Sequence, residues 1–395
     1  MSKFQVKWGI LACGGIATTF ARDLTVNPET RGVKDIEHTV VAAASSSSAD
    51  RAKDFLKTIG ASSSAKAYGS YEELVADKDI QVIYIATPHS HHFQNAMLCL
   101  EAGKNVLCEK AFTVNAKQAK ILADKAKEKN LFLMEAVWTR YFPLSIYVRE
   151  NITSGRIGNV QRVLADNSIG VAPESFGDDH RMVNRELAGG ALLDLGIYSL
   201  TWVFQTLYLT QPENERKAPT VVSSMKKFRT GADEMVTMLL TFPRSDKAGG
   251  DAIAVATTSM RVSADPDGKG SAGPAVRVQG DKGEIQVWFP TFRPTKTRIV
   301  LTDGTVEDKD WPQPGPGKGS GFVNGFGEMN PEGEGHGMFW EADEVGHALK
   351  EGRKEGKYES IQESVVIMDV MDQVRKQNSL TYPEKIETTE YPTKL

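Results

Sequence analysis

The sequence is poor in cysteine and has no long apolar stretch, and these two absences exclude several classes of protein. Its three cysteines, Cys13, Cys99 and Cys108, are odd in number and lie in apolar surroundings. This pattern argues against a disulfide framework and for a reducing compartment. No apolar run reaches the roughly 18 residues that a transmembrane helix requires. Strand-like sequence begins within a few residues of Met1 and leaves no room for a signal peptide, so we expect a cytoplasmic protein.

The chain also lacks a block of basic residues. Its 47 Lys and Arg are outnumbered by 51 Asp and Glu, and the formal net charge is −4 at pH 7. Nucleic acids and membrane surfaces are therefore not expected partners. In other respects the composition is that of an average globular protein, with 40% hydrophobic and 25% charged residues. A length of 395 residues favours two domains.

The first third of the chain alternates between strand-like and helix-like segments. We expect strands at 6–12, 38–44, 65–68, 82–87, 105–108 and 131–136. We expect helices between them at 16–25, 49–59, 71–76, 91–102 and 115–129. Such alternation predicts a doubly wound parallel sheet, the α/β architecture of a Rossmann domain, over residues 1–142.

The pattern changes after Phe142-Pro143, where extended runs follow one another. We expect strands at 160–169, 220–228, 235–242, 252–262, 275–279, 284–289 and 297–302, and helices at 144–154, 189–208, 339–349 and 361–377. Strands in series predict an α+β domain with a large open, mainly antiparallel sheet over residues 143–395. In the stretch 312–337, which is rich in Gly and Pro, Phe322 and Phe326 favour a packed functional loop over a disordered one. Whether this loop is a lid stays open.

The turn that follows the first predicted strand lacks the first glycine of a dinucleotide fingerprint. The spacing G-x-G-x-x-G/A falls on Ala12, Gly14 and Ala17. Gly14 lies where the backbone must approach a phosphate, and the N-terminus of the next helix attracts a pyrophosphate. A single match of this kind also fits an ordinary strand–turn–helix unit. The predicted cofactor-binding residues of this turn are Gly14, Gly15, Ile16 and Ala17.

No acidic residue follows the second predicted strand until Asp50. A Rossmann domain places the adenine ribose at this point, and an acidic residue there selects NAD. The run Ser45-Ser46-Ser47-Ser48 and nearby Arg51 instead offer donors to a 2′-phosphate, which favours NADP. The alternative is a plain serine loop with a helix N-cap. The predicted contacts to the 2′-phosphate are Ser45, Ser46, Ser47 and Arg51.

The segment Thr87-Pro-His-Ser-His-His92 suggests a metal site, but no Asp, Glu or Cys lies nearby at a metal-ligand spacing. The segment follows a predicted parallel strand, whose carboxyl end is the ligand-binding edge of such a sheet. We therefore predict no metal and a loop over the nicotinamide, with Thr87, Pro88 and His92 as contacts. A simple helix start is the alternative.

Four further residues have chemistry that suits proton transfer. Glu109-Lys110 ends another predicted strand at the same edge, and a lysine there can polarise a hydroxyl or lower the pKa of a neighbouring acid. Asp194 and Tyr198 are four residues apart in an apolar segment, so both project from one face of a predicted buried helix. Buried polar groups need partners or a pocket. The functional interpretation makes Tyr198 a proton acceptor whose pKa is lowered by Lys110; the alternatives are a surface ion pair and a structural hydrogen-bond network.

Taken in order, these motifs resemble the glucose–fructose oxidoreductase/inositol dehydrogenase superfamily over nearly the whole chain. The motifs are the glycine turn, Thr87-Pro88 with His92, Glu109-Lys110, and Gly190-x3-Asp194-x-Gly196-x-Tyr198. The sequence is most similar to the dimeric dihydrodiol dehydrogenases and NADP-dependent D-xylose 1-dehydrogenases, which also carry Tyr in place of His at position 198. This closer similarity lies in Trp8-Gly-Ile, Ala67–Leu74, Leu131–Arg140 and Leu187–Asp194.

The resemblance implies NADP-dependent oxidation of an aldopyranose, with D-xylose as the expected substrate, at C1 to the 1,5-lactone. It implies that Lys110 and Tyr198 are catalytic and that Asp194 lines the site. Trp138 is then a candidate for stacking on the sugar, with a core role at the domain junction as the alternative. Arg181 and Asn184 are weaker candidates for contacts to sugar hydroxyls.

The resemblance also implies a homodimer formed through the C-terminal sheet. It leaves two other functions open: oxidation of trans-dihydrodiols, and dinucleotide sensing by a regulator without catalysis. The joint presence of Lys110 and Tyr198 argues against the regulator. One departure concerns Ala111, which stands where the superfamily commonly has a proline after a cis bond. Whether the Lys110–Ala111 bond is cis stays open.

Overall fold

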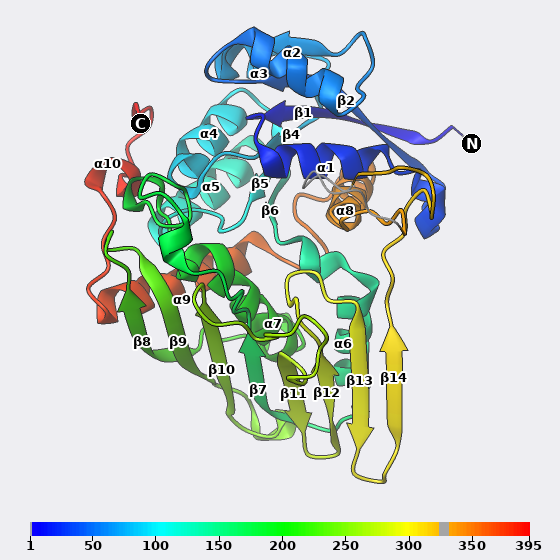
Figure 1. Cartoon of the computed structure of the whole chain (residues 1–395), viewed down its shortest axis with the longest axis vertical. Helices are drawn as coiled ribbons and strands as arrows, with labels where there is room; N and C mark the ends of the chain where they lie inside the picture. The colour runs from blue at the N-terminus through cyan, green and yellow to red at the C-terminus, as the bar shows by residue number, and fades with distance from the viewer. Residues whose placement is uncertain (1, 324–331) are drawn as a thin grey trace.

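The computed structural model describes residues 2–323 and 332–395, so Phe326 lies outside the described residues. The described chain contains two sheets, one above the other in Figure 1. The first has six strands in the order β3-β2-β1-β4-β5-β6, and every neighbouring pair is parallel. Its strands are β1 (Phe4–Leu11), β2 (Ile36–Ala44), β3 (Lys66–Tyr68), β4 (Val82–Ile85), β5 (Asn105–Glu109) and β6 (Leu133–Ala136).

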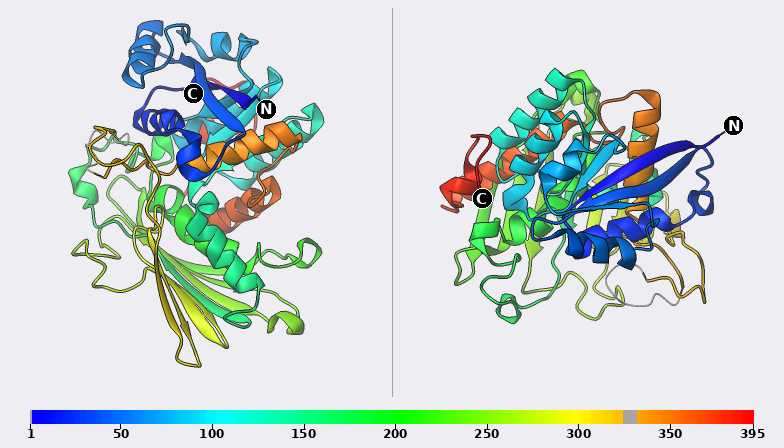
Figure 2. Two further views of the ribbon diagram at one scale, coloured as in Figure 1. Left: turned by 90° about the vertical axis from the view of Figure 1, so that its right-hand side faces the viewer. Right: turned by 90° about the horizontal axis from the view of Figure 1, so that it is seen from above.

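Helices lie on both sides of this first sheet (Figure 2, right), which confirms the predicted doubly wound architecture. They are α1 (Gly15–Thr25), α2 (Ala49–Thr58), α3 (Tyr71–Ala76), α4 (His89–Glu101) and α5 (Ala116–Lys129). All four residues of β4 are buried, as expected for a central strand covered on both faces. The strand order reverses between β1 and β4, and the crevice at the carboxyl ends of two such strands is where doubly wound sheets bind ligands.

The second sheet has eight strands in the order β14-β13-β12-β11-β7-β10-β9-β8. Its neighbours are antiparallel except for β10 and β7, which confirms a mainly antiparallel sheet. The strands are β7 (Val160–Asp166), β8 (Thr220–Lys227), β9 (Asp233–Phe242), β10 (Ala252–Ser259), β11 (Val276–Gly280), β12 (Gly283–Val287), β13 (Lys296–Leu301) and β14 (Val306–Asp310). The sequence did not predict β14, because Val-Glu-Asp-Lys-Asp has no apolar alternation and the strand is mostly exposed.

Helices α6 (Pro143–Thr153) and α7 (Ile197–Leu207) follow the first sheet and cover one face of the second, where α7 packs on β7 and β10. The last helices are α8 (Phe339–Glu351), α9 (Ile361–Gln377) and the short α10 (Glu384–Glu387). The predicted domain boundary between residues 142 and 143 coincides with the start of α6. Yet α8, which the sequence grouped with the second domain, packs on α1, β1 and β2, and α9 joins α5 to β8.

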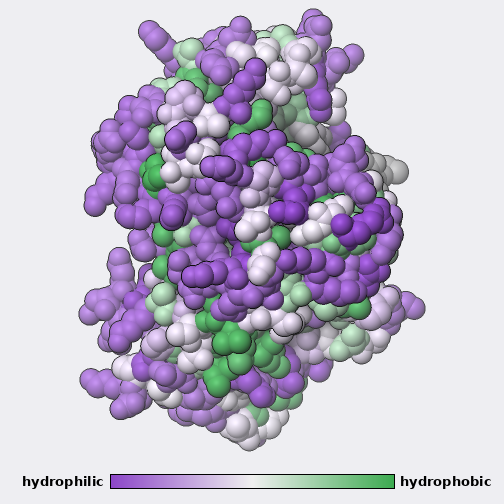
Figure 3. Space-filling model, turned by 90° about the vertical axis from the view of Figure 1, so that its left-hand side faces the viewer, coloured by the Kyte–Doolittle hydropathy of each residue, from purple (hydrophilic) through white to green (hydrophobic). Residues whose placement is uncertain are grey.

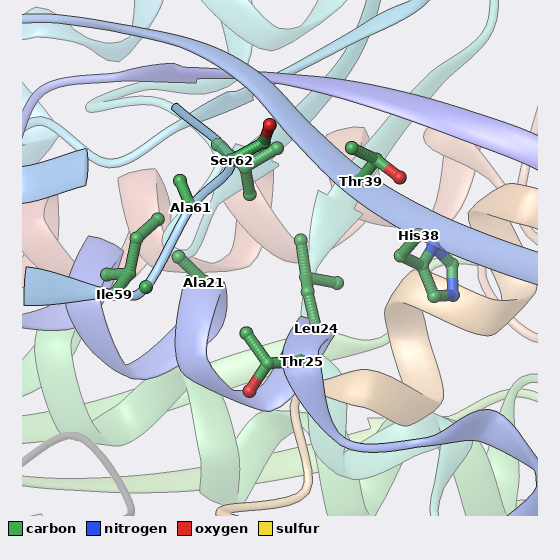
Figure 4. Close-up of a pocket in the computed structure, with 10 residues that line it drawn as sticks. Ala21, Leu24, Thr25, His38, Thr39, Ile59, Ala61 and Ser62 are labelled. Atoms are coloured by element: carbon green, nitrogen blue, oxygen red, sulfur yellow. The ribbon is translucent and has the colours of Figure 1, made fainter. Parts of the chain in front are cut away.

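A buried polar cluster fixes α8 to the first sheet. Arg31 donates from Nε to Asp343 of α8 over 2.6 Å, and His38 Nε2 lies 2.9 Å from the same carboxylate. The indole N–H of Trp8 donates to His38 Nδ1, so the Nε2 proton is the one that faces Asp343. Figure 4 shows His38 on β2 beside a hollow of about 140 Å³ near α1. Of the ten described residues that line this hollow, His38 alone is titratable, so we assign the cluster a structural role.

The described residues lack two kinds of structural feature. They contain no helix that is both long and apolar enough to cross a bilayer. They also contain no cluster of three His, Cys, Asp or Glu side chains with the geometry of a metal site.

Candidate active site

A cavity of about 460 Å³ opens at the carboxyl edge of the first sheet, where the two sheets approach each other. Both halves of the chain supply its walls. The lining residues from the first half are Gly14, Gly15, Ile16, Ala86, Thr87, Pro88, His89, Glu109, Lys110 and Trp138. Those from the second half are Arg181, Leu187, Asp194, Leu195, Tyr198, Phe292 and His336. Lys110 and Tyr198, which are distant in the sequence, thus share one cavity.

The glycine turn has the form that a bound pyrophosphate requires, although its first glycine is missing. Ala12 has a φ of +77°, in the left-handed region that glycine usually occupies. Gly14 is the N-cap of α1, no side chain caps this helix, and a Cβ on Gly14 or Gly15 would meet nothing within 4 Å. The backbone N–H groups of the first turn of α1 are therefore accessible from the cavity, and they fit a phosphate group. Ala17, also predicted as a contact, is fully buried between α1 and the sheet.

The predicted 2′-phosphate site lies at the carboxyl end of β2, outside the 460 Å³ cavity. Ser45 Oγ is 2.9 Å from Ser47 Oγ, and Ser48 caps α2 by accepting from the Arg51 backbone N–H. The cap is what the plain serine-loop alternative expects of Ser48. The side chain of Arg51 is exposed on the first turn of α2. A role of these residues in binding stays a prediction.

Asp194 is held by two cations at the floor of the cavity. Lys110 Nζ donates to its Oδ1 over 2.8 Å and to its backbone oxygen over 2.9 Å, and Arg181 Nη1 donates to Oδ1 over 3.0 Å. Burial alone would raise the pKa of Asp194, but Lys110 and then Arg181 outweigh it and hold that pKa well below its usual value. The carboxylate is thus ionised and fixes the position of the lysine ammonium.

His89 approaches the same carboxylate, with Nε2 4.0 Å from Asp194 Oδ1. Its burial lowers the imidazole pKa to about 3, despite the attraction of Asp194, so the ring is neutral at pH 7. The sequence predicted Thr87, Pro88 and His92 as contacts from this segment. Thr87 and Pro88 line the cavity, and the histidine that lines it is His89 and not His92. His92 is fully buried, and its ring nitrogens lie 2.8 Å from the carbonyl oxygen of Thr87 and 2.9 Å from that of Ala111. This residue therefore ties the loop after β4 to the loop after β5.

The loop after β5 presents Glu109 and Lys110 to the cavity, and its Lys110–Ala111 bond is cis. Glu109 accepts a hydrogen bond from the Tyr84 hydroxyl and, through Oε2, one from the Lys110 backbone N–H over 3.2 Å. Burial raises the pKa of Glu109, and the Lys110 charge only partly offsets this. Glu109 therefore helps to hold the backbone of Lys110 in position.

Tyr198 faces Lys110 across the cavity. The Lys110 ammonium lies 5.2 Å from the centre of the Tyr198 ring, and the Trp138 indole N–H donates to the Tyr198 hydroxyl oxygen over 2.7 Å. The prediction that Lys110 lowers the pKa of Tyr198 is wrong for this arrangement. Burial, followed by the charges of Glu109 and Asp194, raises that pKa well above its usual value, and the Trp138 hydrogen bond offsets this only in part. Lys110 is instead paired with Asp194.

The backbone around Asp194 departs from the predicted single helix over 189–208. Residues Leu192–Gly196 form a π-helical turn, and the α-helix α7 begins only at Ile197. Gly190 has a φ of +136°, and a Cβ there would lie 2.0 Å from Asp233 Oδ1, while the other carboxylate oxygen accepts from the Leu192 N–H. A buried acid from β9 thus shapes this turn. Such π turns are frequent at functional sites, and Asp194 and Tyr198 still line one cavity.

An aromatic wall closes the far side of the cavity. Trp138 is 4% exposed and stacks on His336 with ring centroids 4.7 Å apart and an angle of 15°, and it also packs against Phe292. The structure places Trp138 in the cavity lining, so stacking on a sugar stays a prediction for it. Asn184 does not line the cavity: its side chain accepts from the Glu186 N–H and caps the short turn Arg185–Leu187.

Sequence reasoning missed six lining residues, namely Ala86, His89, Leu187, Leu195, Phe292 and His336. Four of them lay within or beside motifs that the sequence singled out, so their proximity was a usable signal. Phe292 and His336 come from loops whose sequences show no periodicity. His336 had one signal, the expectation of a functional loop over 312–337, of which it is the penultimate residue, and Phe292 had none.

Comparisons with known proteins agree over almost the whole chain. A family model described as "Oxidoreductase family, NAD-binding Rossmann fold" matches residues 6–137, and the GFO/IDH/MocA C-terminal domain matches residues 146–286. The chain is 54% identical to D-xylose 1-dehydrogenase (NADP(+)) of Hypocrea jecorina, over 99% of this chain and 96% of that protein. It is 34% identical to trans-1,2-dihydrobenzene-1,2-diol dehydrogenase of Bos taurus, over 96% and 98%. An NAD binding oxidoreductase from Klebsiella pneumoniae shares its fold, with a TM-score of 0.73 at 20% identity over 95% and 97% of the two chains.

Proposed function

Because the chain belongs to the GFO/IDH/MocA oxidoreductase family, we propose that it is an NADP-dependent dehydrogenase of aldopyranoses, with D-xylose as substrate and the 1,5-lactone as product. The observation that carries this proposal is the position of Lys110 and Tyr198, which face each other across a cavity bordered by the accessible N-terminus of α1. The 54% identity to a D-xylose 1-dehydrogenase supports the choice of sugar.

NADP⁺ would be held by the N-terminus of α1 and by the loops after β2, β4 and β5, where it supplies an acceptor for the C1 hydride. The C1 hydroxyl of the sugar would lie between Lys110 Nζ and the Tyr198 oxygen. Lys110 donates to this hydroxyl and orients it, and Asp194 keeps the ammonium in place. Tyr198 accepts the hydroxyl proton, and the Trp138 N–H stabilises the phenolate that performs this step.

The direct experiment mixes the purified chain with NADP⁺ and a panel of aldoses and follows the appearance of NADPH by its absorbance. We expect turnover with D-xylose and the highest kcat/KM among the aldoses. A second candidate substrate is a trans-dihydrodiol, favoured by the apolar wall of Trp138, Phe292 and Leu195 and by relatives at 34% identity. A higher kcat/KM for the dihydrodiol in direct competition would replace the sugar, and cofactor binding without any turnover would indicate a regulator.

Selection of NADP over NAD is predicted to depend on Arg51. The R51A variant is expected to raise the KM for NADP⁺ by about 10-fold, because a charge-assisted hydrogen bond to the 2′-phosphate is lost. The KM for NAD⁺, which lacks this phosphate, should not change. Steady-state kinetics with both dinucleotides measure the effect.

The matched control is K53A, which removes another exposed cation two residues further along α2. An equal loss of affinity for NADP⁺ and NAD⁺ in R51A, or an unchanged KM for NADP⁺, would remove Arg51 from the proposed site. Ser45, Ser46 and Ser47 would then be the remaining candidates for the same phosphate.

We also propose that two copies of the chain associate through the outer face of the second sheet. Apolar side chains cross four strands in register there, from Val222 to Leu239, Val255 and Leu164. Val222 is 68% exposed and Leu239 is 47% exposed, and in Figure 3 apolar side chains gather on the lower half of the molecule. An exposed apolar stripe of this kind is unusual in a monomer and suits a self-complementary interface.

The L239K variant is expected to shift the chain from dimer to monomer, because a charge at the centre of the stripe would be buried without a partner. Analytical ultracentrifugation at micromolar concentration measures the shift. The control is V306K, which changes a side chain that is 56% exposed on β14, at the far edge of the same sheet. A wild-type chain that sediments as a monomer would exclude this interface.

We propose a cytoplasmic location, because the state of the cysteines fits a reducing compartment, as their number and apolar surroundings in the sequence already indicated. Cys13, Cys99 and Cys108 are all free thiols, and the last two are buried. Burial raises the pKa of the Cys13 thiol to about 11, so even the most accessible cysteine is a weak nucleophile at neutral pH. A chain with three free thiols is suited to a reducing compartment.

A further inference from the structure

The short segment Gly335–Met338 brings His336 to the cavity, and one buried acid, Asp23, holds its backbone. Asp23 is a fully buried residue of α1, and its carboxylate accepts three backbone N–H groups, from His336 over 2.8 Å and from Gly337 and Met338 over 2.7 Å each. Burial raises the pKa of Asp23 to about 6, although these three hydrogen bonds oppose the rise. The carboxylate is therefore mainly ionised at pH 7, and its hydrogen bonds to the segment are charge-assisted.

The second half of the chain holds the same segment from the other side. Arg293, in the loop between β12 and β13, donates from Nε to the His336 carbonyl over 2.8 Å and from Nη2 to the Gly335 carbonyl over 3.1 Å. The two glycines are required by space: a Cβ on Gly337, at a φ of +112°, would lie 2.7 Å from the Phe142 ring. The backbone of the segment is thus fixed from both lobes, and the position of the His336 side chain follows from it.

His336 is placed beside the catalytic tyrosine without a part in the proton transfer described above. Its ring lies flat on the indole of Trp138, and that indole donates to the Tyr198 hydroxyl. The imidazole lines the cavity, and its burial, followed by the charge of Arg293, lowers its pKa to about 3. It is therefore neutral at pH 7. A neutral imidazole has one donor and one acceptor nitrogen, and either kind of nitrogen can form a hydrogen bond with a sugar hydroxyl, which both donates and accepts.

We propose that His336 determines sugar specificity by hydrogen-bonding a ring hydroxyl other than that at C1, and that Asp23 is its positioning residue. The inference rests on the proposed function, which supplies the sugar. The C1 hydroxyl belongs between Lys110 and Tyr198, and the indole of Trp138 separates the Tyr198 hydroxyl from the imidazole. A second hydroxyl further round the same ring is therefore the group that His336 recognises.

The test compares the wild type with H336F on D-xylose and on its 2-, 3- and 4-deoxy analogues. Phenylalanine keeps an aromatic ring against Trp138 and removes both ring nitrogens. For the wild type, kcat/KM should fall by about 10-fold or more on one analogue, the one that lacks the recognised hydroxyl. H336F should lose about 10-fold in kcat/KM on D-xylose, mainly through KM, and should no longer discriminate against that analogue.

A second variant tests the positioning role. D23N replaces an acceptor of three N–H groups by an amide that can accept at only one oxygen. It is expected to raise the KM for D-xylose with little change in kcat. The KM of the double variant D23N/H336F should be no higher than that of H336F, because both substitutions act on one contact. The affinity for NADPH, measured by its fluorescence, reports that each variant is folded. The affinity of the NADPH complex for D-xylose, measured by tryptophan fluorescence, gives a readout that is independent of turnover.

The matched control is H347F, which alters a partly exposed histidine of α8 that does not line the cavity. This variant should keep wild-type kinetics on all four sugars. If the wild type oxidises D-xylose while H336F shows the same ratios between analogues, the inference is wrong and the proposed function stands. If H336F weakens NADPH binding instead of sugar binding, the inference is also wrong. If the wild type oxidises no aldose, the proposed function and this inference fall together.

Discussion

The Y198F variant is expected to lower kcat for D-xylose oxidation by roughly 10²- to 10⁴-fold, the usual contribution of general base catalysis. The change removes the oxygen that accepts the C1 hydroxyl proton and leaves the ring to pack against Phe292. The affinity for NADPH should remain near the wild-type value, because Tyr198 lies on the wall that the second half of the chain supplies. Single-turnover absorbance and NADPH fluorescence measure the two quantities.

The pH dependence of the wild type provides a second readout for Tyr198. Because burial, Glu109 and Asp194 hold the pKa of Tyr198 well above its usual value, the phenol is protonated at neutral pH and the base is scarce. The rate of oxidation should therefore rise with pH across the neutral and alkaline range, and Y198F should lose this slope. The control is Y208F, which removes the same oxygen at the C-cap of α7. A Y198F variant with wild-type kcat and the same pH slope would rule out the tyrosine as the base.

The K110M variant is the second change with a large expected effect. It removes the cation that orients the C1 hydroxyl, and kcat should fall by roughly 10²- to 10³-fold. Arg181 still pairs with Asp194, so the carboxylate retains one partner and the fold should persist. Thermal unfolding measured by circular dichroism checks the fold, and initial rates of NADPH formation measure the loss.

The control for K110M is K117M, which removes an exposed cation at the start of α5. It should leave kcat, KM and thermal stability unchanged. If K110M raised only the KM for NADP⁺ and kept kcat, the lysine would bind the cofactor and take no part in orienting the sugar. Tyr198 would then have to act without a cationic partner.

The parts of the fold that depend on periodicity were predictable from the sequence. The strands of the first sheet are short apolar runs bounded by turn residues, and their alternation with helices determines a parallel order. The motifs at the carboxyl ends of β4 and β5 also lie at one edge for the same topological reason, so Thr87 and Lys110 were correctly placed together. Even Ala12, which breaks the glycine fingerprint, adopts the backbone angle that the fingerprint implies.

The parts that depend on tertiary contacts were not predictable. The π turn around Asp194 exists because Asp233, distant in the sequence, caps the Leu192 N–H beside Gly190, and no local pattern records this contact. The pKa of Tyr198 was misjudged because burial and the charges of Glu109 and Asp194 raise it, and the sequence does not reveal how close these groups lie. His336 enters the cavity because Asp23 and Arg293 hold its backbone, and neither contact is visible along the chain.

The most direct measurement of the central claim follows the hydrogen on C1 of the sugar. The chain is incubated with NADP⁺ and D-xylose that carries deuterium at C1, and the reduced dinucleotide and the sugar product are analysed by mass spectrometry. Direct hydride transfer in the cavity shared by Lys110 and Tyr198 predicts one deuterium in the reduced dinucleotide and none on C1 of the lactone. Unlabelled NADPH, or deuterium retained at C1 of the product, would contradict it.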